Sequence, residues 1–176
     1  EKNAVGDLID AINLSLITYH LSLKLLILGT GPLEQELKDK VKNLKLEDKV
    51  LFLGNVSNDE VPKYLAISNV FIRPSLSEGL GNSFLEAMAA GVPIIGTKVG
   101  GIPDFLIDPS TGSGQATGLF CEVANPKSIA EKINLLLLDE ALRQKLVANA
   151  RQLVSDKYDW DKIAAQMRGI IGRLLI

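Results

Sequence analysis

Two glutamates bracket a glycine-bearing turn near the middle of the sequence. Glu78 is followed by Gly79 and Gly81, and Glu86 lies in the short apolar run that comes next. A turn with glycines that opens a helix presents free backbone N–H groups to an anion, and glycine lets the backbone approach a ligand closely. A carboxylate at Glu78 opposes phosphate binding, but it can accept hydrogen bonds from sugar hydroxyls. The turn therefore predicts a site for a molecule with both phosphate and hydroxyl groups, such as a sugar nucleotide.

Most of this pattern also has a purely structural interpretation. An ordinary strand-to-helix turn favours glycine as well, so Gly79 and Gly81 alone do not decide between the two readings. Ser83, with Glu86 three residues later, matches a capping box, in which both side chains satisfy backbone N–H groups at a helix start. Glu78 has no comparable local explanation, because it precedes the helix and flanks a glycine.

Composition narrows the function classes. The chain has 176 residues and a net charge of −2, which suits one domain and argues against the strongly basic surface of a nucleic-acid binder. A single cysteine, Cys121, excludes an intrachain disulfide and a multi-cysteine zinc site, and a single histidine, His20, leaves no histidine cluster for a metal. No apolar run reaches the roughly 20 residues that span a bilayer. We expect the protein to act in a reducing cytoplasm. The chain begins at Glu1 without an initiator methionine or a signal-peptide pattern, so we interpret it as a fragment of a longer protein.

Short apolar runs alternate with segments of helical periodicity. Because parallel strands need crossover connections, this alternation predicts an α/β fold with a doubly wound parallel sheet, whose ligands collect at the carboxyl ends of the strands. A helix comes first, so we expect one further strand before Glu1. The predicted strands are 23–28, 50–53, 69–73, 93–96 and 118–123; the predicted helices are 4–18, 32–43, 57–67, the helix after the Glu78 turn, 126–138, 139–155 and a last one capped by Asp159 or Asp161.

Two local details accompany these elements. Ser57 with Glu60 predicts a second capping box, at the start of the helix 57–67. The segment 108–118, with its serines and glycines, predicts an exposed loop.

The turn is part of a longer motif. Seven residues separate Glu78 from Glu86 within Ser75-x-x-Glu78-Gly79-Leu80-Gly81-Asn82-x-x-Leu85-Glu86-Ala87-Met88-Ala89. This motif resembles the nucleotide-sugar-binding signature of the family 4 retaining glycosyltransferases (group 1 type), which have the GT-B fold. Five further segments resemble that family in the expected order: Glu1-Lys2, Gly29-Thr30-Gly31-Pro32, Phe52-Leu53-Gly54-Asn55-Val56, Gly96-Thr97-x-x-Gly100-Gly101-Ile102-Pro103-Asp104 and Gly118-Leu119.

The resemblance covers nearly the whole chain and implies its place in a larger protein. Residues 1–176 would be the Rossmann-like, C-terminal donor-binding domain of a GT-B glycosyltransferase. The N-terminal domain, which would bring a glycan, lipid or small-molecule acceptor, would be missing, as would the first strand of this domain. Any peripheral contact with a membrane would then come mostly from that absent part.

The resemblance also implies roles for single residues. Glu78 would hold hydroxyls of the donor sugar and is the predicted catalytic residue, and Glu86 would hold the ribose hydroxyls. The backbone N–H groups at the helix start would face the diphosphate. The remaining predicted donor-site residues are Lys2 at a phosphate, Val56 at the base through its backbone, Leu80 near the sugar, Gly79 in the turn, and Gly81, Asn82 and Ser83 at the diphosphate.

The implied reaction is transfer of a hexosyl-type group from a UDP- or GDP-sugar with retention of the anomeric configuration, without a cofactor or a metal. Two other readings stay open: a sugar-nucleotide epimerase of similar GT-B shape, and a non-catalytic nucleotide-sugar-binding subunit. Asp159-Trp160-Asp161 resembles the D-x-D string of metal-dependent transferases, but its place before the last helix favours a helix cap. Arg73, at the carboxyl end of a predicted strand, could be part of a surface ion pair or could contact the donor.

Overall fold

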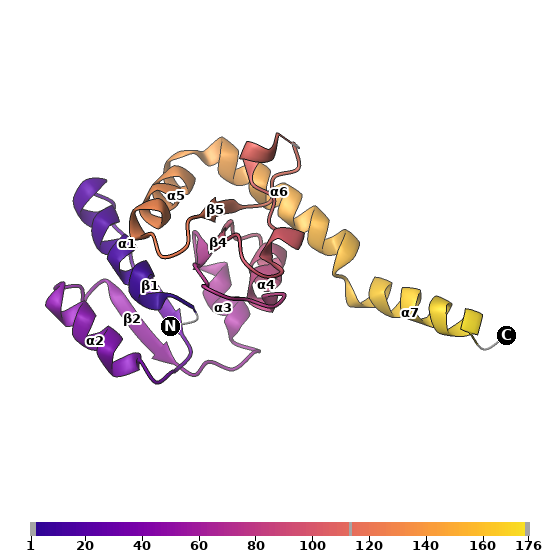
Figure 1. Cartoon of the computed structure of the whole chain (residues 1–176), viewed down its shortest axis with the longest axis horizontal. Helices are drawn as coiled ribbons and strands as arrows, with labels where there is room; N and C mark the ends of the chain where they lie inside the picture. The colour runs from indigo at the N-terminus through magenta and orange to yellow at the C-terminus, as the bar shows by residue number, and fades with distance from the viewer. Residues whose placement is uncertain (1–2, 113, 175–176) are drawn as a thin grey trace.

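The computed structural model describes residues 3–112 and 114–174, and Lys2 therefore lies outside the described residues. Its strands pair in parallel, as predicted, in two groups (Figure 1). β1 (Leu25–Leu28) pairs with β2 (Val50–Gly54), and β4 (Ile94–Thr97) lies between β3 (Phe71–Arg73) and β5 (Leu119–Cys121). The α/β fold with parallel strands is confirmed.

Helices connect the strands and cover them. Their positions agree with the apolar periodicity of the sequence to within a few residues, except at α3. The helices are α1 (Val5–Thr18), α2 (Glu34–Asn43), α3 (Val61–Ala66), α4 (Asn82–Ala90), α5 (Pro126–Leu138), α6 (Glu140–Lys157) and α7 (Trp160–Leu174), with short 3₁₀ turns at Ile102–Asp104 and Pro109–Thr111.

The predicted capping box at Ser57 is wrong. The Ser57 hydroxyl lies 3.2 Å from the Glu60 carboxylate, and the backbone carbonyl oxygen of Ser57 accepts hydrogen bonds from the amides of Glu60 and Val61. These contacts close a separate turn, and α3 begins only at Val61, with no side-chain cap. The S-x-x-E spacing describes this turn as well as it describes a helix start, because both bring the first and fourth residues together.

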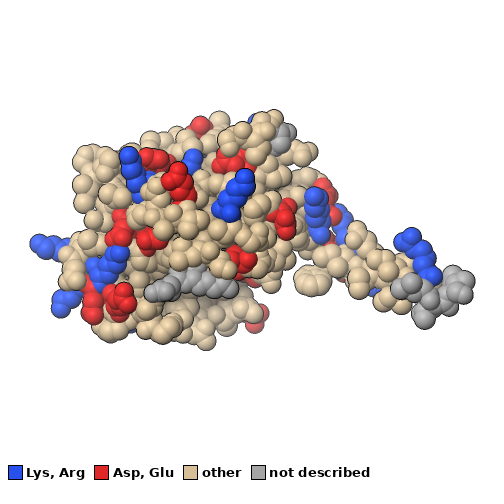
Figure 2. Space-filling model, viewed as in Figure 1, with Lys and Arg blue, Asp and Glu red and all other residues tan. Residues whose placement is uncertain are grey.

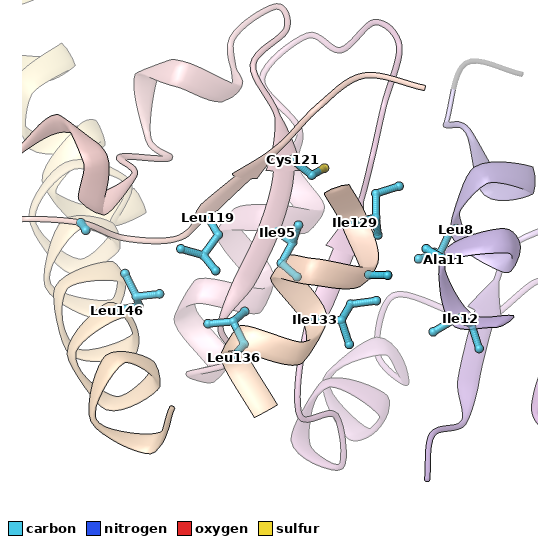
Figure 3. Close-up of a cluster of buried hydrophobic side chains, with 12 residues drawn as sticks. Leu8, Ala11, Ile12, Ile95, Leu119, Cys121, Ile129, Ile133, Leu136 and Leu146 are labelled. Carbon is cyan, nitrogen blue, oxygen red and sulfur yellow. The ribbon is translucent and has the colours of Figure 1, made fainter. Parts of the chain in front are cut away.

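The main core lies between α1, α5 and the three-stranded sheet. In Figure 3, Leu8, Ala11 and Ile12 face the α5 side chains Ile129 and Ile133. Ile95 of β4 and Leu119 of β5 pack on the other side of α5, and all seven side chains are at most 6% exposed. Burial of this apolar surface fixes β4 and β5, and with them the edge of the sheet at which the Glu78 turn lies.

The segment 108–118 is only partly the exposed loop that the sequence predicts. Residues 109–112 are exposed, but Asp108, Ala116 and Thr117 are buried. The carboxylate of Asp108 accepts hydrogen bonds from the amides of Ser110 and Phe120, and the Thr117 hydroxyl donates to the carbonyl of Phe105. Both ends of the loop are therefore anchored to the body of the protein.

The last helix, α7, projects from the body beyond α6 (Figures 1 and 2). Several of its large apolar side chains face solvent: Trp160 is 80% exposed, Met167 53%, Ile170 49% and Ile171 50%. The Asp159 carboxylate accepts a hydrogen bond from the Lys162 amide at 3.1 Å, so Asp159 caps this helix as predicted. Among the helices that the structure describes, none is long and apolar enough to cross a membrane.

Candidate functional site

The Glu78 turn starts at the carboxyl end of β3. Pro74 and Ser75 leave the strand as buried residues, and the Thr97 hydroxyl at the end of β4 donates a hydrogen bond to the Ser75 carbonyl at 2.5 Å. β3 and β4 run parallel with Arg73 opposite Gly96. The turn therefore lies at the sheet edge where ligands of parallel α/β folds collect.

Gly81 starts the helix that follows. Its φ of 73° is in the left-handed region, and α4 begins at the next residue. Phe84 is fully buried and packs against Phe71 and Phe105, with ring centroids 5.3 and 5.5 Å apart. These contacts hold the first turn of α4 on the core. Gly79, in contrast, is not among the residues with positive φ, so of these two glycines only Gly81 uses the left-handed conformation.

The start of α4 is open to a ligand. No side chain caps it, Asn82 is exposed, and the Phe84 amide bonds back to the Gly81 carbonyl at 2.9 Å. The first amides of a helix have no partner within the helix, and the helix dipole makes this end favourable for anions. The predicted diphosphate residues Gly81, Asn82 and Ser83 thus lie together at one helix N-terminus.

Glu78 is fixed by donors on three sides. Its Oε2 atom lies 2.9 Å from Nη2 of Arg73 and 3.3 Å from the Ser75 hydroxyl, and its Oε1 atom accepts a hydrogen bond from the Gly79 amide at 3.1 Å. The side chain is only 9% exposed. A carboxylate with two oxygens can accept about four hydrogen bonds, so Oε1 retains capacity for a ligand hydroxyl.

The capping box that Ser83 and Glu86 match in sequence does not form. Ser83 is the second residue of α4, and its hydroxyl accepts a hydrogen bond from Nη1 of Arg73 at 2.9 Å. Glu86 is exposed and has no hydrogen-bond or ion-pair partner among the residues that the structure describes. Glu86 therefore has no role as a helix cap, and its carboxylate is free to accept hydrogen bonds from a bound molecule.

A second glycine turn supports the first, and the sequence assigns it no role in the site. The Gly101 amide donates to the Gly79 carbonyl at 3.0 Å. A Cβ atom on Gly100 would lie 1.8 Å from the Glu78 carbonyl oxygen, and one on Gly101 would lie 2.7 Å from that of Gly79. Only glycine allows this approach. The sequence signal was the Gly-Gly pair after a strand that neighbours β3.

The other predicted site residues are distributed around the turn. Leu80 is 44% exposed beside Gly81. Val56 lies two residues beyond β2, which belongs to the two-stranded sheet. Glu78 and Glu86 instead follow β3, which belongs to the three-stranded sheet. Two surface hollows, of about 590 and 470 Å³, are lined by residues of α2 and by residues around β5 and α5, and none of their lining residues belongs to the Glu78 turn. Within the described ranges, no group of three or more His, Cys, Asp or Glu side chains could hold a metal ion.

The chain is similar to proteins of known sequence. The family model described as glycosyl transferases group 1 matches residues 1–153. The chain is 40% identical over 147 residues to N-acetyl-alpha-D-glucosaminyl L-malate synthase of Bacillus anthracis, covering 84% of this chain and 36% of that protein. It is 33% identical over 150 residues to a GDP-mannose-dependent alpha-(1-6)-phosphatidylinositol monomannoside mannosyltransferase of Mycobacterium tuberculosis, covering 81% and 37%. The chain thus spans little more than a third of these relatives.

Solved structures show the same fold. Anabaena Alr3699/HepE in complex with UDP and glucose matches with a TM-score of 0.83 at 21% identity, over 98% of this chain and 45% of that one. The C-terminal domain of a glycosyl transferase group 1 family protein (LpcC) from Francisella tularensis matches with a TM-score of 0.78 at 28% identity, over 90% and 81%. The second of these is a C-terminal domain crystallised by itself.

Proposed function

The chain belongs to the glycosyl transferases group 1 family, because that family's model matches residues 1–153, and we propose that it is the donor-binding part of a retaining glycosyltransferase. The observation that carries this proposal is the pairing of an immobilised carboxylate, Glu78, with an uncapped helix start at Gly81. The carboxylate accepts hydrogen bonds from the sugar, and the amides receive the diphosphate.

The geometry suggests how such a site would promote transfer. Departure of a nucleoside diphosphate builds negative charge on its phosphate oxygens, and preorganised amides at the start of α4 stabilise that charge without rearrangement. Glu78 keeps the sugar oriented, and the leaving diphosphate assists deprotonation of the acceptor. This reaction needs no protein nucleophile. Glu86, exposed on α4, would hold the ribose hydroxyls.

The proposed donor is a UDP- or GDP-sugar with a hexosyl-type group. UDP is supported by the HepE structure, which contains UDP and glucose, and GDP by the GDP-mannose-dependent relative. Val56 would meet the base through its backbone, and Leu80 would lie near the sugar. Lys2, outside the described residues, would neutralise phosphate charge.

We further propose that the 176 residues bind a donor but do not transfer the sugar, because the acceptor side would belong to another part of a longer protein. Two features support this. The chain spans 36% and 37% of the two relatives, and the apolar residues of α7, Trp160 among them, are left exposed. Large exposed apolar patches mark interaction surfaces. The acceptor would be a glycan, a lipid or a small molecule, and the whole protein would act in the cytoplasm, with any membrane contact peripheral.

Transfer is proposed to be independent of metal. Asp159, the first residue of the D-x-D string, caps α7 through its contact with the Lys162 amide. Addition of EDTA to the full-length protein should leave the transfer rate unchanged, and a loss of activity restored by Mg²⁺ or Mn²⁺ would contradict metal independence.

Calorimetry on this chain tests donor binding. Titration with UDP, GDP and ADP should give heat with UDP or GDP and less with ADP. Absence of heat from all three at millimolar concentration would count against the proposal. The ADP arm controls for unspecific binding of a diphosphate.

Two other functions share this site and differ in their products. A sugar-nucleotide epimerase would convert a UDP-sugar without an acceptor, which product analysis of the full-length protein would reveal. A non-catalytic binding subunit would tolerate Glu78→Ala in an assembled complex without loss of transfer. For the proposed transferase, transfer requires an acceptor and Glu78→Ala abolishes it.

A further inference from the structure

Arg73 joins three segments at the candidate site. Its Nη2 atom lies 2.9 Å from Glu78 Oε2 and donates to Asn3 Oδ1 at 3.1 Å, while its Nη1 atom donates to the Ser83 hydroxyl at 2.9 Å. Each segment carries a predicted donor-site residue: Glu78 and Ser83 themselves, and Lys2 next to Asn3. The sequence left Arg73 open between a surface ion pair and a donor contact, and these contacts support neither description.

The burial of the pair argues against a simple surface interaction. The Arg73 side chain is 29% exposed and that of Glu78 is 9% exposed. The Nε atom of Arg73 is buried and has no hydrogen-bond partner among the described residues. Removing two charges from water costs free energy that their attraction often only offsets, so a largely buried pair is weak evidence for a stabilising role. A role in holding the site accounts for the arrangement better.

The chemistry of arginine suits that role. A guanidinium is a planar fork that donates in fixed directions, so one side chain can hold a carboxylate and a hydroxyl at the same time. Lysine offers a single point charge on a flexible stem and cannot fix both. The positive charge beside Glu78 also reduces the repulsion that this carboxylate would exert on a bound diphosphate.

We propose that Arg73 is the positioning residue of the donor site. It fixes the Glu78 carboxylate against the first turn of α4, so that the free side of Oε1 faces the sugar hydroxyls while the helix amides face the diphosphate. This inference rests on the proposed function, because it assumes that Glu78 contacts the sugar. Arg73 acts through Glu78 and Ser83.

The test compares binding of a nucleoside diphosphate with binding of the matching nucleotide sugar. Calorimetry with UDP, UDP-glucose, GDP and GDP-mannose gives, for each variant, the ratio of the two dissociation constants, which reports the contribution of the sugar. Arg73→Met should weaken binding of the nucleotide sugar, relative to binding of the nucleoside diphosphate, by about tenfold. Glu78→Ala should shift the ratio in the same direction. The double variant should lose little more than either single variant, because both remove the same interaction.

The matched control is Arg151→Met. Arg151 donates to the Ala90 carbonyl at 3.1 Å, at the opposite end of α4, so its loss weakens the anchoring of the same helix without touching the turn. The ratio should stay at its wild-type value in this variant, even if stability falls as much as in Arg73→Met. Arg73→Lys should show an intermediate ratio, since the charge remains and the fork is lost.

The outcomes separate the two proposals. If the wild-type chain binds none of the four compounds, the proposed function fails. If it binds them and Arg73→Met keeps the wild-type ratio, Arg73 has no positioning role and the proposed function stands. If Arg73→Met does not fold, Ser83→Ala and Arg73→Lys decide: wild-type ratios in both overturn the inference, and a reduced contribution of the sugar in both supports it.

Discussion

The amide of Gly101 donates a hydrogen bond to the carbonyl of Gly79 at 3.0 Å, and this contact ties the turn after β4 to the turn after β3. The register of the two strands explains it: Arg73 stands opposite Gly96, so the chain positions five to six residues later meet at the same sheet edge. The backbone on either side of Glu78 is thus supported by a segment that a ligand need not touch.

Substitution of Gly100 tests this support. An alanine there would place its Cβ 1.8 Å from the Glu78 carbonyl oxygen, at a residue whose φ is +53°. We expect Gly100→Ala to displace the turn, lower the affinity for a nucleotide sugar by more than about tenfold, and cost roughly 1–3 kcal/mol of stability. Calorimetry and urea unfolding measure the two effects.

Gly112→Ala is the matched control for that change. Gly112 also has a left-handed φ, of +69°, but a Cβ there meets nothing within 4 Å. Gly112→Ala should lower stability only by the backbone strain, about 1 kcal/mol, and should leave the affinity for a nucleotide sugar unchanged. Equal loss of affinity in both variants would show that the contact with Glu78 is irrelevant.

Glu86 should matter for binding and not for folding. Because its side chain is exposed and no described residue is its partner, Glu86→Ala should leave the free energy of unfolding within about 0.5 kcal/mol of wild type. The affinity for UDP or GDP should fall roughly tenfold, because the ribose hydroxyls lose an acceptor. Glu131→Ala, also exposed on a helix, is the control. A stability loss near 1 kcal/mol without an affinity change would instead indicate a helix cap.

Asp108 should make stability depend on acid pH. Burial alone raises the pKa of its carboxyl, but hydrogen bonds from the Phe120 and Ser110 amides and the charge of Lys132 hold that pKa below its ordinary value of 3.8. A lowered pKa in the folded state means that the stabilisation is present above the unfolded pKa and is lost as pH falls through the folded one. Wild type should therefore lose this contribution below pH ~4.

The variant Asp108→Asn isolates that contribution. An amide group cannot accept hydrogen bonds from both Ser110 and Phe120 as the two carboxylate oxygens do. Urea unfolding should show a loss of about 1–3 kcal/mol at pH 7 and a smaller difference from wild type near pH 3. A difference that stays constant from pH 7 to pH 3 would rule out this source of acid sensitivity.

The single thiol should be unreactive in the folded protein. Cys121 is 5% exposed, its Sγ atom lies 3.4 Å from the Gly96 carbonyl, and burial raises its pKa to about 11. Because the thiolate is the reactive form, a disulfide reagent at pH 8 should react slowly with native protein and rapidly in urea. Rapid reaction of the native thiol would mean that β5 opens readily. Cys121 is thus a core residue, as its apolar strand predicts.

Sequence spacing predicted the hydrogen-bond partner of some side chains and missed that of others. Asp159 caps α7 as predicted, because its carboxylate accepts a hydrogen bond from the Lys162 amide, three residues later in the first turn of the helix. Ser83 fits a capping box equally well in sequence, yet its hydroxyl accepts a hydrogen bond from Arg73, ten residues earlier at the end of β3. Spacing along the chain identifies a possible partner, but it carries no information about a stronger donor that folding brings alongside.

The sequence by itself determined the order of the helices and strands, their parallel pairing, and the turn with Glu78 and Gly81 that leads into the helix carrying Glu86. These follow from periodicity and glycine placement, which act over a few neighbouring residues. The tertiary structure alone decided that Arg73 holds Glu78 to Ser83 and that Gly100 and Gly101 lie beneath the Glu78 turn. Those contacts join residues 5 to 22 positions apart in sequence. The contacts of Gly100 and Gly101 exist because β3 and β4 are neighbours whose carboxyl ends meet at one edge, and those of Arg73 exist because the chain folds back from β3 through the turn into α4.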